Sequence, residues 1–219
     1  MPVVQVEAAD HYLVARGETE IAEVYEALPQ ELRPPFPPLE LPGGVMGLVS
    51  RGGFGQTFFF AAEVLGVSFR TSAGRLVQAG GRVIKNVQGY DLVRPFVGSF
   101  GLLGEAQEVV LRLRPARAAA LWRYQREGEL KPRFVWWAEG ERYAYHFGHP
   151  RELQRAGYAP ELKVDGLLDY RGYFSQGMGV GEEGPLRDER FVWCDGCPPP
   201  RPPERFMALA RALDERGEI

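Results

Sequence analysis

The 219-residue sequence is poor in several residue types, and each scarcity excludes a class of protein. It has only two cysteines, Cys194 and Cys197, and therefore cannot form the disulfide framework of a small secreted domain. It has no run of about 18 apolar residues, and its N-terminus shows neither the basic nor the apolar region of a signal peptide. We therefore expect a cytoplasmic protein without a transmembrane segment.

Positive charge is also scarce. The formal net charge is −3, the pI is about 5.8, and the arginines are dispersed along the sequence among acidic residues. A nucleic-acid-binding surface needs a basic patch, so this composition argues against binding to nucleic acid. The hydrophobic content of 45% is enough for a sizeable core, most simply as one domain with a smaller one.

Hydrophobic periodicity predicts a mixture of strands and helices in residues 1–115. A helical pattern from Ile21 to Leu28 predicts a helix capped by Thr19, and residues 64–79 alternate around a glycine turn as a β-hairpin. The other predicted elements are strands at 3–7 and 11–15, an extended proline-rich connection at 33–42, a short buried helix at 45–49, a helix capped by Asp91 that continues to Val97 and a strand at 109–113.

Residues 116–219 differ in composition and form the predicted second domain. All four tryptophans and both cysteines lie here. The predicted elements are strands at 133–138, 142–147 and 190–194, a helix near 150–156, a rigid proline linker at 198–203 and a terminal helix at 203–216. Phe134, Trp136 and Trp137 are expected to build the core or an interface, because aromatic surface usually goes into packing.

Cysteine and histidine spacing gives only weak indications of a metal site. Cys194 and Cys197 have the spacing of a redox or zinc pair, but no second pair completes a site, so two incidental thiols are favoured. The spacing of His146 and His149 would allow the two side chains to bind one metal ion. Such a pair more often lies in solvent or in the core. His11 is expected to be a structural residue in a strand. The sequence thus predicts no metal.

Residues 80–104 concentrate the side chains that carry chemistry. The segment has six glycines together with Lys85 and the only asparagine of the chain, Asn86. Glycines let the backbone approach a ligand and expose N–H donors, while Lys, Asn and Ser add fixed polar contacts. Neither the Walker nor the Rossmann spacing is present. Two interpretations are open: the segment holds a polar cofactor, or its glycines only permit sharp turns between packed elements.

The run Lys85-Asn-Val-Gln-Gly-Tyr-Asp-Leu92, followed by Gly98-Ser-Phe-Gly-Leu-Leu-Gly104, resembles the FAD-binding segment of the vanillyl-alcohol oxidase and p-cresol methylhydroxylase superfamily. Within this superfamily, the sequence most resembles the FAD-binding subunits of bacterial glycolate oxidase. The upstream Leu-Pro-Gly-Gly-Val-Met at 41–46 matches that family's Gly-Gly turn. The resemblance covers residues 10–115 and fades beyond them.

The resemblance implies an α+β fold, in which residues 1–115 form a FAD-binding module of the p-cresol methylhydroxylase type and residues 116–219 a small α+β cap domain. It also implies that the leading subdomain, whose glycine-rich loop binds the FAD pyrophosphate, is lacking. The candidates for lining the flavin are Gly43, Gly44, Lys85, Asn86, Gly89, Tyr90, Gly98, Ser99, Gly101 and Gly104. No catalytic base is nominated, because none of the three histidines lies in the matched glycine-rich segment.

By the same resemblance, the chain is expected to be a subunit of an enzyme that oxidises a 2-hydroxy acid such as glycolate to a 2-oxo acid through FAD. Its implied partners are a larger FAD-binding subunit and an iron–sulfur subunit, and any membrane association would come through that complex. The alternative is a non-catalytic structural subunit that keeps the scaffold and binds little or no FAD. In either case, we expect the isolated chain to hold FAD weakly and to show negligible turnover.

Overall fold

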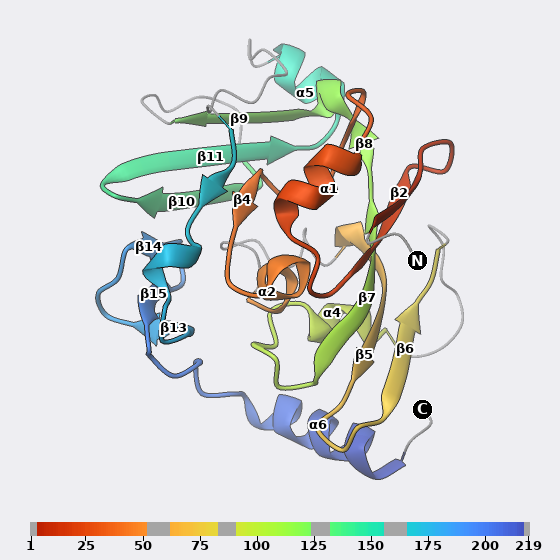
Figure 1. Ribbon diagram of the computed structural model, residues 1–219, viewed down its shortest axis with the longest axis vertical. Coiled ribbons are helices and arrows are strands. Elements are labelled where there is room, and N and C mark those ends of the chain that lie inside the picture. The colour runs from red at the N-terminus through yellow and green to blue at the C-terminus, as the bar shows by residue number, and fades with distance from the viewer. Residues whose placement is uncertain (1–3, 52–61, 83–90, 124–131, 156–165, 217–219) are drawn as a thin grey trace.

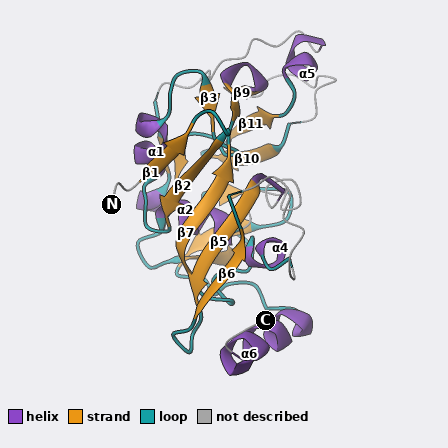
Figure 2. Cartoon of the chain, turned by 90° about the vertical axis from the view of Figure 1, so that its right-hand side faces the viewer, coloured by secondary structure: helices purple, strands orange, loops and turns teal. Residues whose placement is uncertain are grey.

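The computed structural model describes residues 4–51, 62–82, 91–123, 132–155 and 166–216. These residues form two larger antiparallel sheets and two small two-stranded ones, with helices beside and between them (Figures 1 and 2). Helices and antiparallel strands do not alternate regularly along the chain. The fold is therefore α+β, as the sequence predicted.

The first large sheet has the strand order β1-β2-β7-β5-β6. Its strands are β1 (Val4–Glu7), β2 (Tyr12–Arg16), β5 (Val64–Arg70), β6 (Leu76–Gly80) and β7 (Glu105–Arg112). β5 and β6 form the predicted hairpin, with Gly74 at φ +80° in its turn. In the central strand β7, Val109 lies opposite both Ala15 and Val67, and all three side chains are buried.

The second large sheet has the order β13-β15-β14-β10-β11-β9. Its strands are β9 (Ala119–Arg123), β10 (Phe134–Ala138), β11 (Glu141–Phe147), β13 (Met178–Gly181), β14 (Leu186–Arg187) and β15 (Val192–Asp195). Strands 134–138, 141–147 and 192–195 agree with the prediction, whereas β9, β13 and β14 were not foreseen. Aromatic pairs cross the centre of the sheet, where Phe134 lies opposite Tyr145 and Trp136 opposite Tyr143.

The helices are short apart from the last. They are α1 (Ile21–Ala27), α2 (Gly44–Ser50), α4 (Val93–Phe96), α5 (Pro150–Arg155) and α6 (Glu204–Arg216), with 3₁₀ turns η1 (Ala116–Ala118) and η2 (Arg171–Tyr173). Asp214 anchors α6 to the β5–β6 turn, because its carboxylate accepts bonds from Ser72 Oγ at 2.6 Å and Ala73 N at 3.1 Å. These bonds also lower the pKa of Asp214.

Two predicted helix caps were wrong. Glu20, not Thr19, caps α1, and its backbone N–H donates to Glu23 Oε2 at 2.9 Å in a capping box. Thr19 instead uses its carbonyl to accept Val45 N at 2.9 Å, which joins it to α2. Leu92 is the cap residue of α4, although the Asp91 carboxylate does accept the N–H of Arg94 at 3.3 Å.

The two halves of the chain share one hydrophobic core. β4 (Leu39–Glu40) pairs in parallel with β12 (Leu168–Asp169), and β3 (Leu32–Arg33) pairs with β8 (Arg114–Pro115). A single cluster of buried apolar side chains runs from the first sheet through α1 and α2 to the second sheet. Figure 1 shows α1 and α2 between the two sheets. Within the described residues, no helix is long and apolar enough to span a membrane.

Candidate functional site

Helix α2 organises those candidate glycines that the structure describes. Gly43, at φ +89°, caps the helix, and Gly44, at φ +56°, begins it. A side chain on Gly44 would collide with the carbonyl oxygen of Thr19. Gly44 is therefore required by the packing of α2 against the segment before α1, whether or not a ligand is bound.

The loop at residues 98–104 is attached to the other end of α2. Gly98 N donates to Val49 O at 2.9 Å, and Phe100 N donates to Ser50 O at 2.8 Å. These bonds satisfy carbonyl groups at the end of the helix. Gly98 and Gly101 have φ of +75° and +80°, and the loop therefore turns sharply twice within a few residues. Phe100, between them, also has a positive φ of +53°.

The three remaining candidates in this loop have different surroundings. A side chain at Gly104, where φ is +134°, would collide with the carbonyl oxygen of Arg70, so this glycine serves the packing of the loop on β5. Gly101 has nothing within 4 Å of the position a Cβ would take. The Ser99 side chain is buried, and its Oγ has no hydrogen-bond partner among the described residues.

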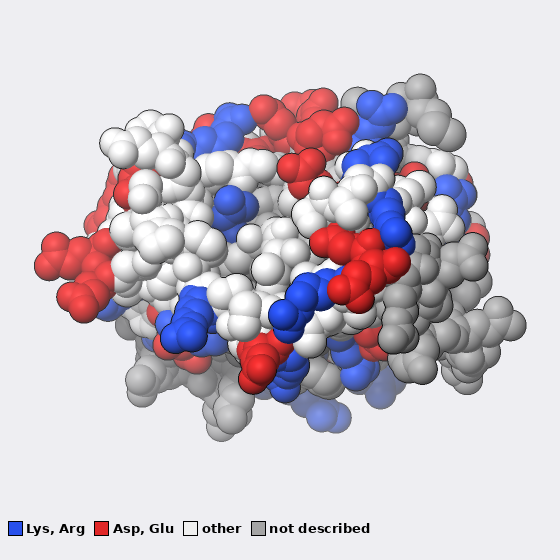
Figure 3. Space-filling model, turned by 90° about the horizontal axis from the view of Figure 1, so that it is seen from below, with Lys and Arg blue, Asp and Glu red and all other residues white. Residues whose placement is uncertain are grey.

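A cavity of about 510 Å³ lies beside this loop, on the face where α6 is found. It is lined by Gly98, Ser99, Phe100, Gly101, Leu102, Phe191, Pro199, Pro200, Arg201, Pro202, Pro203 and Phe206. Phe100 and Phe191 meet edge to face at 5.5 Å between ring centroids. Figure 3 shows the molecule from below, where uncharged side chains cover much of the middle of the face. The cavity therefore combines an apolar lining with a backbone that turns sharply.

The structure thus brings together three of the ten candidates. Gly98, Ser99 and Gly101 line the cavity. Gly43 and Gly44 lie at the opposite end of α2, about 10 Å away along a seven-residue helix. Lys85, Asn86, Gly89 and Tyr90 lie outside the described residues, so their placement in the site stays a prediction.

Arg51, at the end of α2, was missed by the sequence analysis. Its Nη1 donates to Pro42 O and Gly47 O, both at 3.3 Å, so the side chain folds back along the helix toward Gly43. Burial lowers the pKa of Arg51, because removal from water destabilises the charged form of the guanidinium group. The sequence feature that could have indicated Arg51 was a single basic residue directly after an apolar helix.

Glu40 is a second group that the sequence did not reveal. Its side chain is fully buried, and Oε1 accepts the N–H of Ala22 at 2.9 Å. Burial raises the pKa of Glu40, while the bond from Ala22 and the charge of Arg171 act in the opposite direction. The carboxyl group thus supports the start of α1 from a neighbouring strand, which is a structural role.

The two histidines of the spaced pair, His146 and His149, have different surroundings. His146 is buried, with Nε2 at 3.2 Å from Glu152 Oε2, whereas His149 is exposed and its Nδ1 accepts the N–H of Arg151 at 3.2 Å. Within the described part of the chain, no cluster of three metal-ligating side chains is found. His11 is not in a strand as expected, because it occupies an exposed turn at φ +55° before β2.

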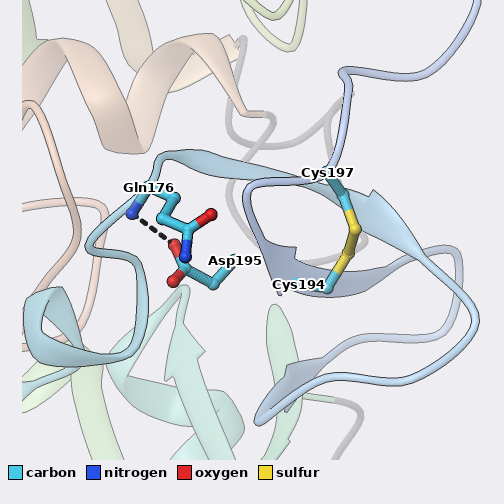
Figure 4. Close-up of a disulfide and its surroundings, with 4 residues drawn as sticks. All are labelled: Gln176, Cys194, Asp195 and Cys197. Carbon is cyan, nitrogen blue, oxygen red and sulfur yellow. Dashed lines mark hydrogen bonds between the residues drawn. A yellow bond between two sulfur atoms is a disulfide. The ribbon is translucent and has the colours of Figure 1, made fainter.

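Cys194 and Cys197 are joined by a disulfide, which corrects the expectation of two separate thiols (Figure 4). Their Cα atoms are 5.7 Å apart, within the normal range for such a bond. Asp195, between them, accepts the N–H of Gln176 at 2.6 Å and the hydroxyl of Ser175 at 3.0 Å. The turn after β15 is therefore fixed both covalently and by hydrogen bonds.

Comparison with known proteins supports the family resemblance over part of the chain. Glycolate oxidase subunit GlcE of Escherichia coli (strain K12) is 47% identical over 58 residues, which is 26% of this chain and 17% of that protein. Glycolate oxidase subunit GlcD of Bacillus subtilis (strain 168) is 42% identical over 52 residues, which is 24% of this chain and 11% of that protein. The expected similarity to glycolate oxidase subunits is confirmed, over less than a fifth of the length of either relative.

Most of the second half of the chain matches a protein-family model. Residues 117–196, which include the whole second sheet, match a family of unknown function, DUF5639. Among solved structures, alkyldihydroxyacetonephosphate synthase has a TM-score of 0.42 and 16% identity, covering 55% of this chain and 22% of that one. The grass pollen allergen Phl p 4, which has glucose dehydrogenase activity, has a TM-score of 0.45 and 18% identity, covering 73% and 39%.

Proposed function

We propose that this chain is a FAD-binding subunit of a flavin-dependent 2-hydroxy-acid oxidoreductase complex of the glycolate oxidase type. The observation that carries the proposal is the segmental identity of 47% and 42% with two subunits named as glycolate oxidase. The cavity beside Gly98, Ser99 and Gly101 supports it, because candidates taken from the family resemblance line a hollow of ligand-binding size.

The described lining of this cavity fits the flat ring system of FAD better than its charged pyrophosphate. The rings of Phe100, Phe191 and Phe206 lie among prolines, and this apolar lining suits a flat aromatic ring system. Arg201 is the one charged side chain among the described lining residues, and we assign it to the cofactor's pyrophosphate. When bound, FAD would supply the acceptor for the hydride of the 2-hydroxy acid.

In this proposal, the chain orients the cofactor and keeps water from it. The loop at 98–104 is held to α2 by the bonds from Gly98 and Phe100, so its position does not depend on the ligand. The described lining residues include no Asp, Glu, His or Lys. We therefore assign the base that takes the hydroxyl proton to a group beyond this lining, in the wider complex.

The second candidate function is a structural subunit that binds little or no FAD. A specific observation favours it: the N–H groups of Gly98, Ser99, Phe100, Leu102 and Gly104 all donate to carbonyl groups of the protein. Gly44 and Gly104 also fill packing positions. Donors that are already used add little to the binding of an anionic cofactor.

A flavin titration of the purified chain separates these two functions. We expect the fluorescence of FAD to be quenched on binding, and the substitution Arg201→Glu to weaken its affinity about tenfold by reversing the one lining charge. Arg211→Glu is the matched control, because Arg211 is exposed on α6 and does not line the cavity. Absence of binding in the unmodified chain would favour the structural subunit, and equal affinities of the two variants would refute this cavity as the FAD site.

A further inference from the structure

A second cavity, of about 550 Å³, lies at the other end of the molecule and has a different chemistry. It is bounded by β8, η1, the turn at 148–149 and α5, which Figure 1 shows close together near the top. Gly148 N donates to Ala118 O at 3.0 Å and thereby holds this turn against η1. None of the candidates for lining the flavin that the structure describes belongs to it.

Three arginines from separate segments line this cavity: Arg114, Arg117 and Arg151. The described lining residues include no Asp or Glu. This concentration of positive charge does not follow from the composition, because the chain as a whole carries a net charge of −3. Folding therefore places Arg151 beside Arg114 and Arg117, which are close to each other but distant from Arg151 in the sequence.

The acidic residues near the cavity contact other side chains, so Arg117 and Arg151 remain available to a ligand. Glu63 contacts Arg114 Nη2 at 2.6 Å and Arg112 Nε at 3.6 Å, so Arg114 is fixed as part of the wall. Glu152 on α5 contacts His146 Nε2 at 3.2 Å. Arg117 and Arg151 are exposed, and neither has an acidic partner among the described residues.

His149 adds a directed donor to the same wall. Its Nδ1 accepts the backbone N–H of Arg151 at 3.2 Å. A neutral imidazole whose Nδ1 accepts carries its proton on Nε2, which is then a hydrogen-bond donor. The amide of Gln154 provides a further polar group on the lining.

We propose that this cavity binds a small soluble molecule through its phosphate or pyrophosphate group. Guanidinium groups match phosphate oxygens in pairs, and a cavity of this volume accommodates a metabolite of ordinary size. The proposal is independent of FAD binding at the lower cavity, because the described linings of the two cavities have no residue in common.

Calorimetric titration of the full chain with inorganic pyrophosphate at low ionic strength tests the proposal. We expect saturable binding that the double substitution Arg117→Gln/Arg151→Gln weakens about tenfold or more, since both replaced groups are charged donors. The matched control is Arg155→Gln/Arg211→Gln, which removes the same charge from exposed positions on α5 and α6 that do not line the cavity. Thermal melts of both variants verify that the fold is kept.

Three results would overturn the proposal. The first is absence of pyrophosphate binding by the unmodified chain, and the second is an equal loss in the lining and control variants, which would indicate a general charge effect. The third is cosedimentation with vesicles of phosphatidylcholine and phosphatidic acid without any binding of pyrophosphate, which would assign the arginines to a membrane surface instead.

Discussion

The loop at 98–104 and the strand pair β10–β11 are held in shape by opposite means. The loop has three glycines with positive φ, and at Gly104 the backbone of β5 occupies the space of a side chain. The strand pair has no glycine within 134–138 or 141–147, and rings stack across it at 5.4 Å and 6.0 Å between centroids. The loop therefore has no room for an added side chain at Gly104, whereas the strand pair depends on keeping its buried aromatic rings.

Removal of an aromatic side chain from the strand pair should give the largest effect. Trp136 is fully buried, and its Nε1 donates to the hydroxyl of Tyr170 at 3.0 Å. We expect Trp136→Ala to lower the free energy of unfolding by about 3–5 kcal/mol, through the cavity and the lost bond. Trp137→Ala is the control, because Trp137 is only partly buried between Arg142 and Arg187. Urea denaturation measures both, and similar losses would contradict the role given to the stack.

A side chain added to the loop should be the next most damaging change. We expect Gly104→Ala to cost about 2–4 kcal/mol, because its Cβ meets the Arg70 carbonyl and its φ is unfavourable for alanine. Gly101→Ala, which has open space but also a positive φ, should cost only about 1–2 kcal/mol. If thermal melts show the two variants to be equally stable, packing is not what requires glycine at position 104.

Replacing a polar side chain with an apolar one tests whether the glycine-rich segment also has a ligand-binding role. We expect Asn86→Leu to weaken FAD binding by about 10- to 100-fold, the cost of losing one buried polar contact. Gln78→Leu on the exposed side of β6 is the control. Flavin fluorescence measures the affinity and circular dichroism the fold. An unchanged affinity in Asn86→Leu would remove this residue from the proposed site.

The smallest expected effect concerns pH and Glu40, on the strand that joins the two halves. Because burial raises the pKa of Glu40, the folded protein binds its proton more tightly than the unfolded chain does. The stability of the unmodified protein should therefore fall, relative to Glu40→Gln, as pH rises above the ordinary value of 4.5. Denaturation curves of both proteins at about pH 4.5 and about pH 8 measure this difference in unfolding free energy. An equal change in unfolding free energy between the two pH values for both proteins would contradict the prediction.

Periodicity was sufficient for elements whose neighbours are close in sequence. The helix from Ile21 and the hairpin around Gly74 follow from local pattern, because the capping box of the helix and the strand pairing of the hairpin join residues that are close in sequence. The pairing of Leu39 with Leu168 has no such signal, since two-residue strands show no alternation. The cap at Glu20 was missed because Thr19 is the more usual cap residue, whereas a capping box with Glu23 decided the position.

The sequence nominated residues for the candidate site, but it did not predict how they are arranged. The sequence singled out Gly98, Ser99 and Gly101, and these line one cavity. It gave no indication that Phe191 and the prolines at 199–203 form the opposite wall, because that wall comes from a distant segment. The cysteine spacing fits thiols and a disulfide equally well, and only the turn after β15 shows that the two sulfurs meet.

The pairing of β4 with β12 has a consequence for how the protein folds as it is made. Leu39 leaves the ribosome long before Leu168, so the apolar face of α1 and α2 has no complete cover until most of the second half has been synthesised. Contacts between such distant residues slow folding, because the intervening chain must first be ordered. A nascent chain paused in the second half would thus expose the surface that chaperones bind.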